Sequence, residues 1–192
     1  MIKLEGFTLV LASQSPRRKE LLAGLGLEFT IRTKPVQEDF PMDLAPERVA
    51  AFLSKKKADA FEGEIGPTEI ILTSDTVVIL EGAILGKPLD AAEATSMLRN
   101  LSGKSHTVVT GVTLTSQSKQ VTASDMAKVV FKELSDDEIS FYIDQFQPMD
   151  KAGAYGIQEW IGFIGVEKID GSFFTVMGLP LHLVYRILKN WG

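Results

Sequence analysis

The chain has 192 residues, of which 45% are hydrophobic and 23% charged, as in an ordinary globular protein. Its net charge of −5 argues against a surface that binds nucleic acid polymers, so a nucleotide site would be a local basic pocket. The absence of cysteine excludes disulfides, thiolate metal sites and cysteine nucleophiles. We expect one domain over residues 1–192. Because the early apolar run Phe7–Ala12 is too short for a signal sequence or a membrane span, we also expect a cytoplasmic protein.

The first third of the chain alternates strand and helix patterns. In chain order, we predict a strand over Phe7–Ala12, a helix over Pro16–Leu25, a strand over Glu28–Thr33, a loop over Lys34–Ala45 and a helix over Pro46–Phe61. A serine before the first helix is a good N-cap, and a glycine after it supplies the stop.

The rest of the chain mixes long strands with helices. We predict a β-rich segment over Glu69–Leu80, a short strand over Ala83–Leu85, a corner at 86–88, a helix over Ala91–Asn100, and paired strands over His106–Leu114 and Gln120–Phe131. A helix over Asp136–Phe146, a glycine-rich stretch over Met149–Gln158, two strands around the Asp170-Gly171 turn and a helix over Leu181–Lys189 complete the order. This mixture predicts an α/β fold with a mixed sheet.

Arg17 and Arg18 stand in the first turn of the first predicted helix, where free N–H groups already make the field positive. Each arginine is unfavourable there by ~0.3–1 kcal/mol unless an anion is present. A serine-rich turn before a helix N-terminus can cradle a phosphate, and two guanidinium forks suit a polyphosphate. Alternatively, both side chains extend into solvent, and both interpretations stay open at this point.

Asp75 interrupts an apolar β-rich run, although aspartate is depleted in strands. A carboxylate in such a buried place needs a cation, a metal ion or a substrate proton as its partner. Asp75 is therefore a candidate general base or magnesium ligand. The alternative is a β-bulge aspartate bonded to nearby backbone N–H groups. We favour the functional interpretation, because the run is otherwise continuous.

Two lysine sites add positive charge. Lys87 lies in the Gly-Lys-Pro corner, where the amine could point into a cleft, and Lys55-Lys56-Lys57 ends the second long helix. On a helical wheel Lys56 falls near the centre of the apolar stripe and Lys57 near its edge. At least one lysine should therefore lean inward, but the periodicity does not say which. A solvated helix end is the alternative for all of them.

The glycine-rich stretch contains Asp150–Gln158, "DKAGAYGIQ". Small residues allow a backbone to approach a ligand closely. The amide of Gln158 can donate and accept side by side, which suits the edge of a base. Taken alone this signal is weak, since any glycine-rich loop looks similar.

Seven stretches together resemble the Maf family of nucleotide pyrophosphatases. They are "LASQSPRRKELL", "SKKKADAF", "SDTVV", "GKPLDAAEA", "LSGKSHTVVTGV", "DKAGAYGIQ" and "VMGLPL", which run in the family's order and cover nearly the whole chain. The resemblance implies an elongated, twisted mixed sheet flanked by helices, with two lobes around a central cleft, as in inosine triphosphate pyrophosphatase-like folds. It also implies hydrolysis of a nucleoside triphosphate to the monophosphate and pyrophosphate with a divalent metal, magnesium or manganese.

The resemblance assigns roles to individual positions. Asp75 matches the family's proton acceptor, and the substrate-binding positions are matched by Ser13, Arg17, Arg18, Lys57 and Lys87. Glu38 matches an acidic residue after the second strand, which makes Glu38 and Asp75 the expected metal ligands. As partners we expect the nucleoside triphosphate but no nucleic acid polymer and no membrane, and a homodimer is left open.

The motif variants resemble the dTTP/UTP subgroup, whose base choice is thought to depend on the positions of Arg17, Thr76 and Gln158. We therefore expect hydrolysis of dTTP and UTP, with clearance of non-standard nucleotides as a further role. Two alternatives stay open. One is a nucleotide-binding regulator of cell division and septum formation. The other is a pyrophosphatase for another, modified or purine, nucleotide.

Overall fold

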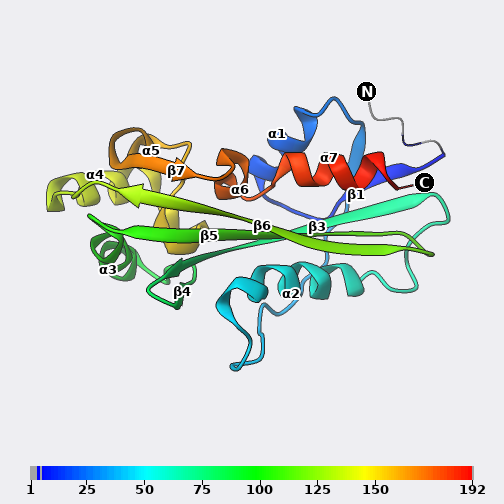
Figure 1. The fold of residues 1–192 in the computed structure, drawn as a ribbon, viewed down its shortest axis with the longest axis horizontal. Coiled ribbons are helices and arrows are strands. Elements are labelled where there is room, and N and C mark those ends of the chain that lie inside the picture. The colour runs from blue at the N-terminus through cyan, green and yellow to red at the C-terminus, as the bar shows by residue number, and fades with distance from the viewer. Residues whose placement is uncertain (1–3, 5, 192) are drawn as a thin grey trace. The chain divides into compact units, whose positions relative to one another are not determined.

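The computed structural model describes residue 4 and residues 6–191 as a mixed α/β fold (Figure 1). The strands are β1 (Thr8–Leu11), β2 (Phe29–Ile31), β3 (Glu69–Leu80), β4 (Ala83–Leu85), β5 (Ser105–Thr115), β6 (Gln120–Phe131) and β7 (Val166–Asp170). The α-helices are α1 (Pro16–Ala23), α2 (Pro46–Asp59), α3 (Ala91–Leu101), α4 (Asp136–Phe146), α5 (Trp160–Gly165), α6 (Phe173–Met177) and α7 (Leu181–Lys189). Two 3₁₀ turns, η1 (Pro148–Asp150) and η2 (Ala152–Ala154), follow α4.

The strands form one seven-stranded mixed sheet in the order β2-β1-β3-β5-β6-β7, with β4 paired to β3. β1 is parallel to both neighbours, with Leu9 opposite Phe29 and Ile70. The β3–β4 and β6–β7 pairs are antiparallel. This confirms the prediction of a mixed sheet flanked by helices.

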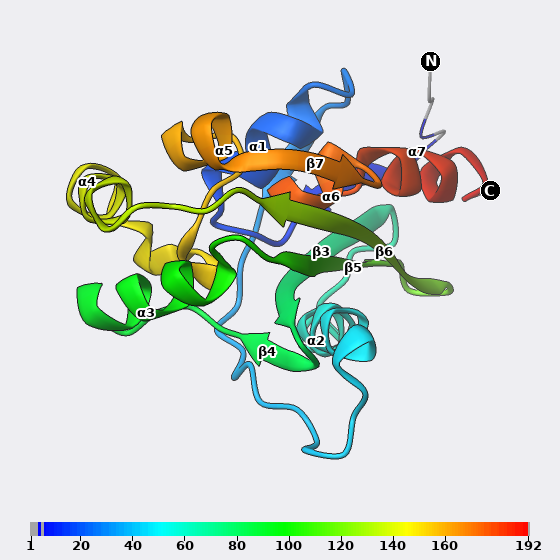
Figure 2. The same cartoon turned by 60° about the vertical axis from the view of Figure 1, so that its left-hand side comes forward.

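The chain forms two compact units. The first comprises Met1–Asp75, Thr110–Asp125 and Gly178–Gly192, and the second comprises Thr76–Val109 and Met126–Met177. Within the first unit, α2 lies on one face of the strands, while α1 and α7 lie on the other (Figure 1, Figure 2).

Close contact between α2 and β5 explains a glycine in the middle of a long strand. A Cβ on Gly111 would lie 2.4 Å from the carbonyl carbon and oxygen of Ala50, and 2.5 Å from the backbone nitrogen of Ala51. Only glycine therefore lets the helix backbone pack directly on the strand. This contact sets the distance of α2 from the sheet.

The second unit has its own hydrophobic core. Helices α3, α4 and α5 pack with strand residues around buried side chains, namely Val78, Leu80, Ala94, Met97, Leu98, Leu101, Val108, Val129, Phe131, Ile139, Tyr142, Ile143, Ala154, Tyr155, Ile157 and Ile161. Helix α4 begins with the capping box of Ser135 and Glu138, whose side chains each bond to the other's backbone N–H. The glycine-rich stretch is held in this core by its own apolar residues Ala154, Tyr155 and Ile157.

The prediction of two strands around Asp170-Gly171 is half wrong. β7 precedes the turn, but the residues after it form the short helix α6, in which the N–H of Thr175 bonds to the carbonyl of Ser172 at 3.0 Å. Gly171 has φ +126°, and a Cβ there would lie 2.8 Å from the Cα of Ala127. The chain therefore turns sharply away at Gly171, and this context overrides the β propensity of the Phe-Phe-Thr-Val run.

Helix α5 was also not predicted, and the polar residues within the Glu69–Leu80 segment do not interrupt its strand. α5 forms although Gly162 and Gly165 lower its helix propensity, because the core of the second unit buries Ile161. β3 is a continuous strand through Ser74-Asp75-Thr76. Within the described part of the chain, no helix is long and apolar enough to cross a bilayer.

Candidate active site

Asp75 is buried near the middle of β3, with 7% of its surface exposed, and its carboxylate pairs with the ammonium of Lys57. Lys57 Nζ also lies 2.7 Å from Glu38 Oε1, so one lysine joins two carboxylates from different segments. The lysine supplies the counter-charge that a buried carboxylate requires. The Asp75 carboxylate thus has a side-chain partner from α2, as the functional interpretation expects.

Buried hydroxyls fix the turn of α2 that carries Lys57. Ser54 Oγ lies 2.7 Å from Thr113 Oγ1, and Thr73 Oγ1 donates to the backbone carbonyl of Ser54 at 2.7 Å. Ser54 and Ala58 are fully buried, and on the helical wheel Lys57 lies between the buried Leu53 and Ser54. This resolves the ambiguity left by periodicity. Lys57 points to Asp75, whereas Lys56 pairs with Asp39 at 2.5 Å.

The α1 N-terminus has the predicted serine-rich turn. Ser15 caps the helix by accepting from the N–H of Arg18, and Ser13 Oγ accepts from the N–H of Ser15 at 3.2 Å. Both serines thus shape the turn by local hydrogen bonds. Arg17 is half-buried beside them.

The Arg18 side chain turns inward. Its Nε donates to the carbonyl of Gly178 and its Nη1 to the carbonyl of Ser74, both at 2.8 Å. Burial lowers the pKa of Arg18, while Asp75 opposes this effect, so the guanidinium sits in a desolvated site beside the carboxylate. The solvent-exposed alternative is therefore wrong for Arg18.

Ser74 joins β3 to the backbone of Gly178, a contact that the sequence analysis did not predict. Its Oγ donates to the carbonyl of Gly178 at 3.1 Å, so Gly178 accepts from both Arg18 and Ser74. Gly178 has φ +100°, a conformation that favours glycine. The "VMGLPL" stretch thus provides a backbone carbonyl that binds Ser74, the residue before Asp75. Its glycine was the only sign of this role in the sequence.

The remaining predicted residues belong to the second unit. Thr76 is half-buried in β3 next to Asp75, and Gln158 is half-buried after the buried Gly156 and Ile157. Lys87 is exposed in its corner, where the carbonyl of Gly86 accepts from the N–H of Gly153 at 2.9 Å. The corner and the glycine-rich stretch are therefore joined within this unit.

A polar cluster next to Gln158 was not predicted. Tyr142, on α4, donates its hydroxyl to Glu159 and accepts from the N–H of Gly156 at 3.0 Å. Lys151 Nζ lies 3.2 Å from Glu159 Oε1 and 2.7 Å from Asp150 Oδ1. The one signal available was a tyrosine on the apolar face of α4, since a buried hydroxyl needs a partner.

The comparisons with known proteins agree with these motifs. A family model described as a Maf-like protein matches residues 8–191. The chain belongs to the Maf family. A dTTP/UTP pyrophosphatase of Bacteroides fragilis is 50% identical over 191 residues, covering 99% of both chains. Proteins of the same name from Porphyromonas gingivalis (49% identical, 98% of this chain and 96% of the relative) and Flavobacterium johnsoniae (45%, 98% and 97%) are also similar.

Two carboxylates of this Maf protein fit a hard divalent cation. Glu38 and Asp75 already contact one positive group, the Lys57 ammonium, and a magnesium ion that also binds phosphates needs only one or two protein carboxylates. Among the described residues there is no group of three or more metal-binding side chains. The donor set therefore suits a metal that shares its coordination with a nucleotide and water.

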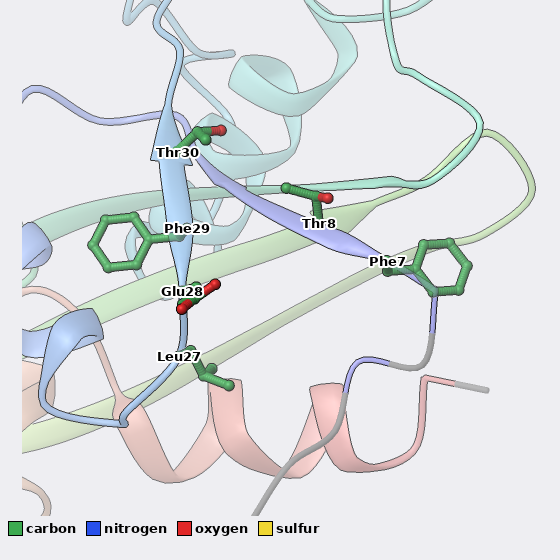
Figure 3. Close-up of a pocket in the computed structure, with 6 residues that line it drawn as sticks. All are labelled: Phe7, Thr8, Leu27, Glu28, Phe29 and Thr30. Atoms are coloured by element: carbon green, nitrogen blue, oxygen red, sulfur yellow. The ribbon is translucent and has the colours of Figure 1, made fainter.

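A separate pocket of the Maf protein contains none of the predicted site residues. Figure 3 shows its lining, Phe7, Thr8, Leu27, Glu28, Phe29 and Thr30, around β1 and β2. Its volume is about 580 Å³. Among the described residues of that lining Glu28 alone is charged, and its negative charge does not suit a triphosphate.

Proposed function

We propose that this chain hydrolyses dTTP and UTP to the nucleoside monophosphate and pyrophosphate. The observation that carries this proposal is full-length similarity, at about half identity, to proteins named dTTP/UTP pyrophosphatase. The Asp75–Lys57 pair and the arginines of α1 support it, because a carboxylate and several cations lie within one unit.

In this proposal Asp75 accepts a proton from the attacking water. The water oxygen forms a bond to the α-phosphorus while the bond from that phosphorus to the bridging oxygen breaks. Pyrophosphate leaves with the bonding electron pair. Arg17, Arg18, Lys57 and Lys87 offset the charge that develops on the leaving group, and Ser13 orients the substrate.

Lys57 also positions two carboxylates in this proposal. Its contacts with Asp75 and Glu38 hold both carboxylates in place before substrate arrives. Glu38 and Asp75 would hold the divalent cation, magnesium or manganese, which when bound neutralises charge on the triphosphate. Arg17, Thr76 and Gln158 select the base.

The remaining predictions accompany this proposal. They are a single functional domain over residues 1–192, two lobes around a cleft on an elongated, twisted sheet, a cytoplasmic location and a nucleotide as the partner. A homodimer stays open, as does a role in clearing non-standard nucleotides.

Product identity tests the proposed reaction. Purified protein with dTTP or UTP and magnesium should release one pyrophosphate per nucleoside monophosphate, measured by anion-exchange separation of the products. Release of orthophosphate and the diphosphate would contradict attack at the α-phosphorus. Binding without turnover would favour a regulator, and turnover of purine nucleotides alone would favour a different specificity.

A further inference from the structure

The side chains next to Gln158 are arranged around the α-carbon of Gly156. A Cβ on Gly156 would lie 2.7 Å from Glu159 Cδ, 2.9 Å from Glu159 Oε2 and 3.0 Å from Gln158 Nε2. The carboxylate of Glu159 and the amide nitrogen of Gln158 therefore border the same small space. A side chain at this position would displace the ends of both side chains, and glycine leaves them where they are.

Glu159 is itself held from two sides. The hydroxyl of Tyr142 donates to Oε2, and the ammonium of Lys151 lies 3.2 Å from Oε1. Tyr142 and Lys151 are both buried, so these contacts are shielded from water. Burial and Glu159 raise the pKa of Tyr142, which keeps the hydroxyl protonated as the donor.

The same hydroxyl ties the carboxylate to the backbone. Tyr142 accepts from the N–H of Gly156 at 3.0 Å, so one oxygen sets the spacing between Glu159 and the turn that precedes Gln158. The Glu159 carboxylate is thus held near the amide nitrogen of Gln158, since both lie within 3.0 Å of the Cβ position of Gly156.

We propose that Glu159, held by Tyr142 and Lys151, fixes the orientation of the Gln158 amide and thereby selects uracil and thymine over cytosine. The inference rests on the proposed function. A carboxylate attracts the NH₂ end of an amide and repels its oxygen. With its nitrogen toward Glu159, the Gln158 amide presents its oxygen to the ring N–H of uracil or thymine.

Cytosine needs the opposite arrangement, because its ring nitrogen is an acceptor. To bind it, the amide would have to rotate and place its oxygen against the Glu159 carboxylate. A site whose polar groups cannot pair with the wrong base discriminates strongly. Glu159, Tyr142 and Lys151 are therefore positioning residues, which act on the base through Gln158.

The test is the ratio of kcat/KM for UTP to kcat/KM for CTP in Glu159→Gln. This change keeps the shape and removes the charge, so the amide becomes free to rotate. The ratio should fall by about tenfold or more, mainly through better use of CTP. Asp150→Asn is the matched control, because Asp150 is the other carboxylate on Lys151 and is 60% exposed. The control should keep the wild-type ratio.

Tyr142→Phe is a second variant, which leaves the charge of Glu159 but removes its hydrogen bond. Its ratio should fall in the same direction, and thermal unfolding checks that each variant is folded. A folded Glu159→Gln protein with the wild-type ratio would overturn the inference. If that variant does not fold, an unchanged ratio in Tyr142→Phe overturns it, and so does failure of both to fold, because the cluster is then purely structural.

The proposed function can fail independently. If the wild type hydrolyses neither UTP nor dTTP, that function is contradicted. The orientation of Gln158 is then tested by the Kd values of UMP and CMP, measured by calorimetry. Wild type should prefer UMP and Glu159→Gln should lose that preference. Equal preference in the two proteins, or a wild type that binds neither nucleotide, would overturn the inference.

Discussion

Asp75 is a buried strand carboxylate that pairs with a lysine from another element. Asp75→Asn keeps the shape but removes the proton acceptor, so kcat should fall by ~10²–10⁴ while the protein stays folded. Steady-state kinetics with UTP and circular dichroism measure the two effects. A folded variant with full activity would return Asp75 to a structural role.

Lys57 and Lys55 make a matched pair on α2. Lys57 is 20% exposed and joins two carboxylates, whereas Lys55 is 52% exposed and pairs with Asp59 one turn away. Lys57→Ala should lower kcat/KM by about 10- to 100-fold, since a charged contact contributes ~1.5–3 kcal/mol. Lys55→Ala should change it little. Equal, small effects would mean that this helix end is merely solvated.

The orientations of Lys57 and Arg18 could not be predicted from the sequence. The helical wheel placed both Lys56 and Lys57 near the apolar stripe, but only the folded structure, in which Leu53 and Ser54 are buried on either side of Lys57, shows that Lys57 faces Asp75. The inward turn of Arg18 depends on a carbonyl 160 residues away, which no local pattern encodes. The sequence predicted a positive charge at these positions, whereas the orientation of each side chain depends on tertiary contacts.

At the scale of elements, the contact of α2 with β5 should tolerate no side chain at Gly111. Gly111→Ala should lower the free energy of unfolding by about 3 kcal/mol or more, because the clash is with helix backbone. Gly86→Ala, where a Cβ meets nothing within 4 Å, is the control and should be nearly neutral. Urea unfolding measures both, and a stable Gly111→Ala protein would show that α2 can shift away.

The second unit contains a buried histidine that makes its stability depend on pH. His106 Nε2 lies 2.7 Å from the hydroxyl of Tyr155, and burial lowers the pKa of His106 to about 4. The unfolded chain, with an ordinary histidine pKa, binds a proton that the folded chain does not. Stability should therefore fall as the pH decreases from about 6.5 to 4, by roughly 2 kcal/mol between pH 7 and 5.

His106→Gln should reduce this dependence on pH, because the glutamine does not titrate. Urea unfolding of both proteins at pH 7 and pH 5 measures the difference. Equal losses in the two proteins would show that His106 does not contribute.

Elements differ in how far their sequence determines them. Capping and alternation predicted α4 and β6 with the observed bounds, because both signals are local. The helices α5 and α6 were not predicted, since their glycines and β-branched or aromatic residues favour other structures and packing decides. The polar cluster around Glu159 joins α4 to the glycine-rich stretch, so the pattern of either segment alone could not predict it.

At the scale of the whole molecule, membership of the Maf family rests on nearly the full length, and so does the proposed substrate class. Motifs spread from residue 11 to residue 181 predicted that class together, although none is specific alone. The side chains that surround Gln158 add a physical reason for a preference among pyrimidines.

The most direct measurement is kcat/KM for pyrophosphate release from dTTP, UTP, CTP and methyl-GTP with magnesium. The account predicts efficient hydrolysis of dTTP and UTP, with CTP poor because the Gln158 amide presents its oxygen to the base. Methyl-GTP should also be poor, because a methylated purine is too large for a pocket that fits a pyrimidine. A preference for CTP or methyl-GTP would contradict the account, even if pyrophosphate is released.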